Sequence, residues 1–403
     1  MPEAVIVATA RTPIGRAFKG SLTELRPDDM AAFIVRTVLD KVPQVDAESI
    51  DDLMLGCGLP GGEQGFNMAR VVALLAGLDD VPGCTVTRYC SSSLQTIRMA
   101  AHAIRAGEGD VFVAAGVEAV SRFVKGNSDS LPDTQNPYFF DAIERSLEHA
   151  QGDGHPWAPS KDIADVYIAM GETAENVVEL TGVTREQQDE FAAQSQQRAV
   201  AAQERGFFDR EITPITTPDG SVVSKDDGPR PGTTVEKLAA LKPVFRPQGT
   251  VTAGNACPLN DGAAAVVVMS DTKAKELGIT PLARIVSSGV TGLNPEIMGL
   301  GPIKASQQAL KRAGMTIDQI DLVELNEAFA AQVIPSAAEL GIPWEKLNVN
   351  GGAIALGHPF GMTGARIMTT LLNGLEDAGK TYGLETMCVG GGQGMAMIVE
   401  RLN

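Results

Sequence analysis

Cys90 stands directly before a run of three serines. Serine is a favourable N-cap residue, and the apolar residues that follow recur at helical spacing, which predicts a helix over 94–104. Cys90 then lies at or just before a helix N-terminus, where the helix dipole and free backbone amides stabilise a thiolate. The segment is therefore typical of a nucleophilic cysteine, although a buried structural cysteine fits the same position.

His358 lies in a glycine-rich loop, between Gly357 and Pro359. Glycine allows the backbone to approach a ligand closely, and proline fixes the turn. Histidine is the usual base that activates a cysteine. The alternative is a loop histidine that only caps the following helix, and the pattern alone leaves both interpretations open.

A second thiol, Cys388, ends a predicted strand and is followed by three glycines beginning at Gly390. The bare backbone amides of such a turn can form an oxyanion hole for a substrate carbonyl. Asn326 falls where a predicted strand meets a helix, a usual place for site residues in α/β sheets, and its amide can orient a water. A plain glycine turn and a helix cap are the respective alternatives.

Short buried strands alternate with amphipathic helices along the chain, which indicates α/β layers with largely buried sheets. The strands are expected at 5–8, 52–55, 111–115, 263–269, 283–290, 322–325, 383–388 and 395–399, and the helices at 30–39, 94–104, 185–205, 306–313 and 364–375.

The chain also reads as two diverged copies of one unit. In each copy a helix ends and a strand that begins with Ile-Asp follows, at Ile50 in the first copy and at Ile320 in the second. The spacing from Ile50 to Cys90 is nearly the same as that from Ile320 to His358. Matching the copies divides the chain into a first half, an insertion within it and a second half, at 1–120 with 250–275, 121–249 and 276–403. A loop as long as this insertion is usually functional.

The composition, 44% hydrophobic and 21% charged, is that of a globular protein and excludes a disordered chain. The net charge of −17 makes nucleic acids and anionic membranes unfavourable partners. An anionic ligand then needs local positive charge. The second part of the insertion supplies candidates: Arg198, Arg205, Arg210, Lys225, Arg230, Lys237, Lys242 and Arg246.

The five cysteines form no Cys-x-x-Cys pair, and the four histidines lack zinc-site spacing, so no metal site is expected. No apolar run is long enough to span a bilayer, and the N-terminal residues have no secretory signal pattern. A reducing, cytoplasmic location is expected on these grounds.

Two phosphate-binding patterns are rejected. The segment 374–381 matches a phosphate loop, but it lies at the end of a predicted helix, and Glu376 and Asp377 would repel phosphates. The segment 56–61 matches G-x-G-x-x-G after a strand, but Pro60 breaks the turn where a helix should begin. Gly379 is better interpreted as a helix C-cap.

Taken together, these residues resemble the thiolase family. The resemblance spans essentially the whole chain, through the segments 10–15, 249–255, 260–264, 326–330, 357–359 and 388–394. It implies a five-layer αβαβα fold of two duplicated halves with a large loop insertion in the first. It also implies a 3-ketoacyl-CoA substrate and ping-pong acyl transfer, with coenzyme A as a substrate and no tightly bound cofactor.

By the same resemblance, His358 deprotonates Cys90, and the thiolate attacks the 3-keto carbon. Cys388 protonates the acetyl-CoA enolate that is released, and CoA then takes the acyl group from Cys90. One oxyanion hole comprises His358 and a water held by Asn326, and the other comprises the amides of Cys90 and Gly390.

The inserted loop holds CoA in the family, so Arg230 and Met170 are expected to contact it and Phe329 to line the pantetheine channel. Cys257 replaces a CoA-contacting serine of many members, and a thiol is the weaker hydrogen-bond partner. A homo-oligomer, dimer or tetramer, is expected through part of the insertion.

Two further departures concern Ser93, which replaces a glycine of many members, and Ala169, which replaces a histidine. The small Ala169 suggests space for a longer or bulkier acyl chain. A degradative thiolase of fatty acid β-oxidation is favoured over a biosynthetic acetoacetyl-CoA thiolase. Two alternatives remain. The presence of Cys388 argues against a ketoacyl-synthase-like enzyme, and the presence of both Cys90 and His358 argues against a non-catalytic acyl-CoA-binding protein.

Overall fold

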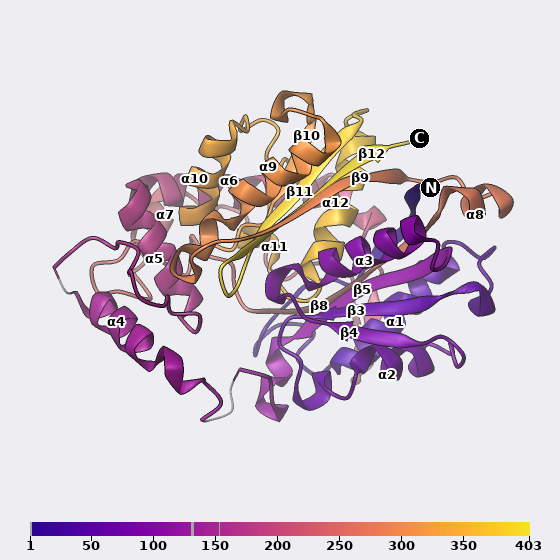
Figure 1. The fold of residues 1–403 in the computed structure, drawn as a ribbon, viewed down its shortest axis with the longest axis horizontal. Helices are drawn as coiled ribbons and strands as arrows, with labels where there is room; N and C mark the ends of the chain where they lie inside the picture. Colours follow the sequence, from indigo (N-terminus) through magenta and orange to yellow (C-terminus); the bar gives the residue numbers. More distant parts are fainter. Residues whose placement is uncertain (1, 130–132, 153) are drawn as a thin grey trace.

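The structure is a computed structural model that describes residues 2–129, 133–152 and 154–403. Its long strands form a single 10-stranded sheet in which the first-half strands lie beside the second-half strands (Figure 1). The first half contributes, in spatial order, β1 (Ala4–Arg11), β8 (Asn260–Ser270), β5 (Val111–Ala119), β3 (Asp52–Cys57) and β4 (Gly83–Val86), with β2 (Gly15–Arg16) added to β8. The second half contributes β9 (Ala283–Gly292), β12 (Gln393–Arg401), β11 (Tyr382–Val389) and β10 (Leu322–Leu325).

The strand order repeats between the halves. The series β1-β8-β5-β3 and the series β9-β12-β11-β10 each have two antiparallel pairings followed by a parallel one. Leu347 bridges β10 in parallel, in the place that β4 takes beside β3. The two series meet only where β1 pairs β9, through Val5 with Arg284 and Ile6 with Ala283. The predicted duplication is therefore visible in the topology.

The two parts of the sheet form two layers of the molecule, and helices form the other three. The helices α3 (Ser92–Ala106) and α12 (Thr363–Asp377) pack together between the two parts of the sheet, within one apolar core. Helices α1 (Pro27–Asp40) and α2 (Met68–Leu75) cover the outer face of the first part, and α9 (Gly301–Ala313) and α10 (Ala330–Leu340) cover that of the second. The predicted five-layer αβαβα arrangement is confirmed.

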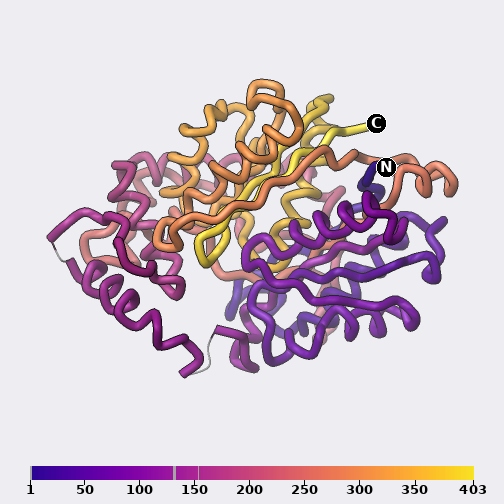
Figure 2. Tube along the Cα trace, viewed as in Figure 1, coloured from indigo at the N-terminus to yellow at the C-terminus, as the bar shows by residue number. Residues whose placement is uncertain are grey.

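The insertion extends from the first half and forms one end of the molecule (Figure 2). It contains α4 (Phe140–Gln151), α5 (Met170–Thr181), α6 (Arg185–Glu204), α7 (Val235–Ala239) and the hairpin β6–β7 (Ile215–Thr216, Val222–Val223). The predicted helix 185–205 coincides with α6, which begins with a capping box made by Thr184 and Gln187. The short helices α8 (Asp271–Glu276) and α11 (Ala353–Leu356) complete the fold.

The predicted strands are present, but most extend beyond their predicted bounds. Residues 5–8 lie within β1 and 263–269 within β8, where polar residues at the ends are also fully buried by the helix layers. β4 was not predicted from the sequence, because its four residues are only half-buried and lack a strong apolar signal.

The two rejected phosphate motifs have structural functions. Residues 374–377 form the last turn of α12, and Gly379 follows with φ of 62°, a left-handed conformation that favours glycine. In the other motif, the amides of Gly58 and Leu59 bind the carboxylate of Glu118, at 2.7 and 3.3 Å. Among the helices of the described residues, none has the length and apolarity to cross a bilayer.

Candidate active site

Cys90 lies in a tight turn, the 3-10 helix η3 (Tyr89–Ser91), directly before α3. The preceding Tyr89 has φ of 42°, a strained value for a side chain of its size. Ser92 holds the turn, because its hydroxyl accepts from the amide of Arg88 at 2.9 Å and donates to the carbonyl of Tyr89 at 2.7 Å. The predicted position of Cys90 at a helix N-terminus is confirmed.

Two opposing effects act on the Cys90 thiol, which is 9% exposed. Burial raises its pKa to about 11, and hydrogen bonding to the Gly390 backbone lowers it. Gly390 lies against the ring of Tyr89, which a Cβ at this position would approach to 3.3 Å. The structure therefore brings the predicted nucleophile and the glycine turn together.

His358 is held as a neutral base with a defined tautomer. Its Nδ1 lies 2.6 Å from Thr363 Oγ1, and that hydroxyl donates to the carbonyl of Pro359 at 2.8 Å. Since a hydroxyl has one proton, Oγ1 must accept from Nδ1–H, which leaves the lone pair on Nε2. Burial, with a smaller contribution from Arg366, lowers the pKa of His358 to about 3.

Asn326 lies 3.3 Å from His358, measured from its Nδ2 to Nε2. It belongs to the connection between β10 and α10, four residues before that helix, so it is not the helix cap that the sequence left open. Its backbone is fixed by Thr386 O, which accepts from its amide at 3.0 Å, and by the Gln332 side chain at 2.8 Å. No described residue hydrogen-bonds its buried Oδ1.

Cys388 is the penultimate residue of β11 and is fully buried. Burial raises its pKa well above the usual range, and Cys90 and Cys257 raise it further by charge repulsion. The three thiols therefore occupy one site, and the resting form of Cys388 is a neutral thiol that can donate a proton.

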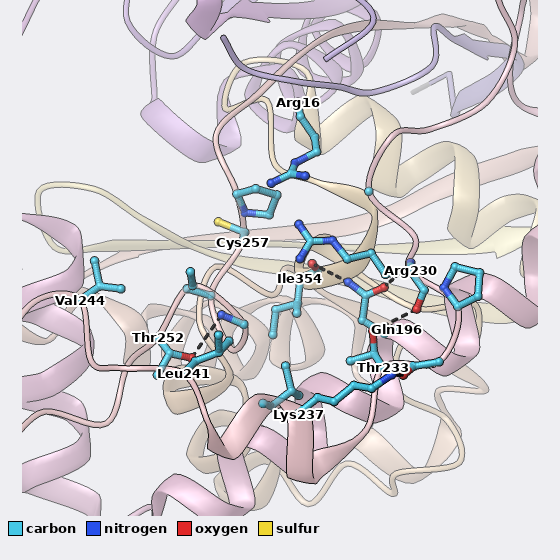
Figure 3. A pocket seen from close by; sticks show the side chains of 18 of the residues that line it. Arg16, Gln196, Arg230, Thr233, Lys237, Leu241, Val244, Thr252, Cys257 and Ile354 are labelled. Atoms are coloured by element: carbon cyan, nitrogen blue, oxygen red, sulfur yellow. Dashed lines mark hydrogen bonds between the residues drawn. The ribbon is translucent and has the colours of Figure 1, made fainter. Parts of the chain in front are cut away.

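A cavity of about 570 Å³ reaches this region from the insertion. Figure 3 shows Arg16 and Arg230 pointing toward one another in it, with Cys257 nearby. Lys237 lines the cavity as well. Three cations in one cavity of an acidic protein provide the local positive charge that an anionic ligand requires.

Met170 and Phe329 do not line this cavity but pack behind it. Both belong to the apolar cluster that contains Cys388 and contacts Cys257. The Phe329 ring lies 6.2 Å from the ring of Phe245, which does line the cavity. Their expected contact with CoA or pantetheine is therefore not evident in this cavity, whereas that of Arg230 and Cys257 fits it.

Several of the predicted basic residues serve the fold instead. Arg246 pairs with Glu172 and Glu179, and Arg210 pairs with Glu376. Of the eight residues, only Arg230 and Lys237 line the cavity. The sequence could not distinguish them, because the acidic partners of Arg205, Arg210 and Arg246 lie far along the chain.

Several residues that fix this geometry had no site role predicted from the sequence. Asn260 Oδ1 accepts from the His358 amide at 2.9 Å, and Ser93 Oγ accepts from the Ala365 amide, in the first turn of α12, at 2.9 Å. Ser93 thereby caps the helix that follows His358 from a position three residues after Cys90. The only signal was the departure from glycine at Ser93, and its effect was unknown without the fold.

Within the described ranges, no group of histidine, cysteine, aspartate or glutamate side chains has the arrangement of a metal site.

Comparisons with known proteins agree over the whole chain. The thiolase N-terminal domain matches residues 4–272, and the thiolase C-terminal domain matches residues 279–401. The chain is 46% identical to a 3-ketoacyl-CoA thiolase of Pseudoalteromonas translucida and 44% identical to a β-ketoadipyl-CoA thiolase of Acinetobacter baylyi, in each case over 100% of both chains. It is also similar to the crystal structure of a Bacillus anthracis acetyl-CoA acetyltransferase, with a TM-score of 0.86 and 41% identity over 100% of this chain and 99% of the other. With the fold, the domains and full-length relatives in agreement, the chain belongs to the thiolase family.

Proposed function

We propose that this thiolase cleaves 3-ketoacyl-CoA with CoA, giving acetyl-CoA and a shortened acyl-CoA through an acyl-Cys90 intermediate. The observation that carries the proposal is that Cys90, Cys388 and the Gly390 turn lie together in one buried site. His358 lies 3.3 Å from Asn326, whose backbone amide donates to Thr386 O on the strand that carries Cys388. The sequence places these groups in both halves of the chain. The site thus contains a nucleophile, a base and an acid, which is the set that thiolysis needs.

In the first step, His358 Nε2 takes the proton of Cys90, and the thiolate attacks the 3-keto carbon of the substrate. The thiol pKa near 11 and the imidazole pKa near 3 mean that the resting pair is neutral. Proton transfer therefore accompanies attack, when the developing oxyanion can interact with the imidazolium.

In the second step, the bond between the α-carbon and the 3-keto carbon breaks, and the electron pair leaves as the acetyl-CoA enolate. The Cys388 thiol protonates the α-carbon, which gives acetyl-CoA. A free CoA thiol then gives its proton to the Cys388 thiolate and attacks the acyl group on Cys90. The Cys90 thiolate that leaves takes back the proton held by His358, so all three groups return to their starting forms. In the synthetic direction, Cys388 removes the α-proton of acetyl-CoA.

Two sets of donors stabilise the oxyanions. The backbone amides of Cys90 and Gly390 face one position. At the other, His358 acts with a water held by Asn326, and the buried, unpartnered Oδ1 of Asn326 supports this role.

The cavity of Figure 3 is the proposed path of CoA. The proposed reaction uses no tightly bound cofactor or metal. Arg230, with Arg16 and Lys237, provides charge for the phosphates. Cys257 lines the cavity, and the backbone amide of Cys257 donates to the carbonyl of Ala328 at 3.0 Å. Met170 and Phe329 support the channel from behind the residues that line it.

The relatives support a 3-ketoacyl-CoA substrate but differ in its acyl group. Relatives named 3-ketoacyl-CoA thiolase favour fatty acid β-oxidation, and those named β-ketoadipyl-CoA thiolase favour an acyl chain that ends in a carboxylate. The biosynthetic reaction is the second candidate, because the crystal structure to which the chain is similar is an acetyl-CoA acetyltransferase.

We further propose a cytoplasmic homo-oligomer in which β4 contributes to the contact between subunits. β4 is the last strand of the sheet, and an unpaired edge is a template for pairing. Exposed Phe66, Leu74 and Leu75 come from the segment before it. We retain 121–249 as the inserted unit between 1–120 and 250–275, and 276–403 as the second half.

Acyl trapping tests the function. The protein is incubated, without free CoA, with 3-ketoacyl-CoA substrates of increasing length and with one that ends in a carboxylate, and adducts are mapped by peptide mass spectrometry. An adduct on Cys90 that added CoA releases, and that H358A does not form, supports the proposal. An adduct on Cys257 or Cys388 would mean a wrong nucleophile, and activity on the four-carbon substrate alone would contradict the longer chain expected from Ala169.

A further inference from the structure

Glu118 is a buried carboxylate that the reaction just described does not use. It lies at the end of β5 and is 0% exposed. Its oxygens accept from the amides of Gly58, Leu59 and Gly361, at 2.7, 3.3 and 2.9 Å, and from Gln64 Nε2 at 2.7 Å. The Cys57 thiol lies 3.8 Å from one of them.

All the hydrogen-bonding partners of Glu118 are neutral donors. No basic side chain in the described part of the chain forms an ion pair with it, and each donor bonds best to the ionised carboxylate. Burial raises its pKa, and these hydrogen bonds oppose that rise. A buried charge without a cation is costly, so its retention needs an explanation beyond fold stability.

The donors belong to the two segments that carry the reacting groups. Gly361 lies three residues after His358 and two before Thr363, which fixes the imidazole. Gly58 follows β3, and the segment that leads into the nucleophile turn attaches there, since Thr87 Oγ1 donates to Gly58 O at 2.9 Å. One carboxylate therefore bridges the loop of the base and the support of the nucleophile.

The two bridged segments approach β5 too closely for a side chain at either glycine. A Cβ at Gly361 would lie 2.2 Å from Val117 O, and a Cβ at Gly58 would lie 2.7 Å from Glu118 Oε2. The backbones thus approach as closely as glycine allows. Small changes at the carboxylate must move one of the two segments.

We propose that Glu118 is a positioning residue of the thiolase reaction: its carboxylate sets the distance between Cys90 and His358 by binding the loops beside both. The inference rests on the proposed function. It assigns to Glu118 no contact with substrate and no proton transfer.

The charge of Glu118 has a separate effect on Cys90, because it disfavours the nearby thiolate and so raises the thiol pKa. Geometry and charge can therefore be separated by two substitutions. E118D keeps the charge but shortens the reach, whereas E118Q removes the charge and places an amide among donors.

The test measures kcat and KM for thiolysis, and the rate of Cys90 alkylation by iodoacetamide as a function of pH, in the full-length protein. A displacement of about 1 Å can cost about 100-fold. We expect kcat to fall at least tenfold in both variants with KM changed less than threefold. In E118Q the alkylation profile shifts to lower pH, and in E118D it stays close to that of the wild type.

E385Q is the matched control. Glu385 lies in the middle of β11 in the second half and is also 0% exposed. Its two oxygens have no described partner, and burial raises its pKa well above the usual range. Glutamine there replaces an already neutral group, so kcat should change less than twofold. Thermal unfolding shows whether each variant is folded.

A wild-type kcat in folded E118D, or an equal loss in E118D and E385Q, would overturn the proposal. The alkylation assay needs no turnover, so it reports on the Glu118–Cys90 interaction even if the wild type forms no acyl-Cys90. In that case the proposed function fails, and a shifted profile in E118Q still supports the effect of the charge. If neither variant folds, the comparison is made in Q64A, which removes one donor, and an unchanged kcat there contradicts the proposal.

Discussion

The ends of β5 and β11 occupy equivalent places in the two halves, but they carry different chemistry. Each strand lies between a parallel and an antiparallel neighbour, and Val117 faces Ala263 of β8 as Cys388 faces Gly394 of β12. In the first half, the next residue is Glu118, whose carboxylate binds only structural donors. In the second half, the Cys388 thiol itself lies close to the thiols of Cys90 and Cys257.

The same contrast holds where the central helices begin. Cys90 precedes α3 and His358 precedes α12, and both helices have 15 residues. The duplicated unit therefore provides two equivalent turns at the centre of the molecule. One half supplies the proposed nucleophile and its proposed supporting carboxylate, and the other supplies the proposed base, the proposed acid and the amide proposed to hold a water.

C90S gives the largest expected effect on this division. A serine hydroxyl is a much weaker nucleophile than a thiol, so thiolysis should fall by about 10⁴-fold or more. The measurement is acetyl-CoA release by the pure protein, with C257S as the control that retains activity. Substantial activity in C90S would assign the nucleophile to another thiol and break the comparison.

H358N tests the equivalent turn of the second half. Asparagine preserves a polar group of related shape but cannot accept the Cys90 proton, so kcat should fall by about 10²–10⁴-fold. The acyl-trapping assay should show loss of the Cys90 adduct in parallel. If kcat is retained while KM rises, His358 contributes to binding rather than to proton transfer.

N326A should have a smaller effect than either. Loss of one oxyanion-hole component costs about 10²–10³-fold in kcat. Because Asn326 acts through a water, we expect its loss to lower kcat by about 10²-fold or less. Steady-state kinetics separate this from a binding defect, since KM should change little. An unchanged kcat would remove Asn326 from the proposed oxyanion hole.

The free enzyme should show alkylation of Cys90 that rises about tenfold per pH unit between pH 6 and 9. The raised pKa of Cys90, to about 11, means that the thiolate fraction grows through this whole range, and His358, with a pKa of about 3, stays neutral. Iodoacetamide labelling followed by mass spectrometry measures it. A plateau near neutral pH would instead indicate a preformed thiolate–imidazolium pair.

S93A should have the smallest effect and act on stability. The hydroxyl caps α12, whose own N-cap residue Met362 makes no side-chain cap, so its loss should lower the free energy of unfolding by about 1 kcal/mol. Denaturant unfolding measures this, with S336A as a buried-serine control, because Ser336 Oγ makes only a 3.4 Å bond. Equal destabilisation in the two variants would contradict the role of the cap.

Much of this arrangement could be predicted because local signals encode it. The serines after Cys90 and the helical spacing beyond them predicted α3, and the repeated Ile-Asp strands predicted two halves. The site roles of His358, Cys388 and Asn326 came from the family resemblance, since each residue alone had an equally good structural interpretation.

The sequence by itself determined the order of elements, because periodicity and turn residues act over a few positions. It also determined that an acidic chain without metal-site spacing carries two thiols and a histidine in glycine-rich surroundings. Only the tertiary structure decided which residues support them. Ser93 with Ala365 and Glu118 with Gly361 are contacts between halves, made by segments more than 200 positions apart. Such contacts depend on how the layers pack, and a buried polar group finds its partner only once that packing excludes water.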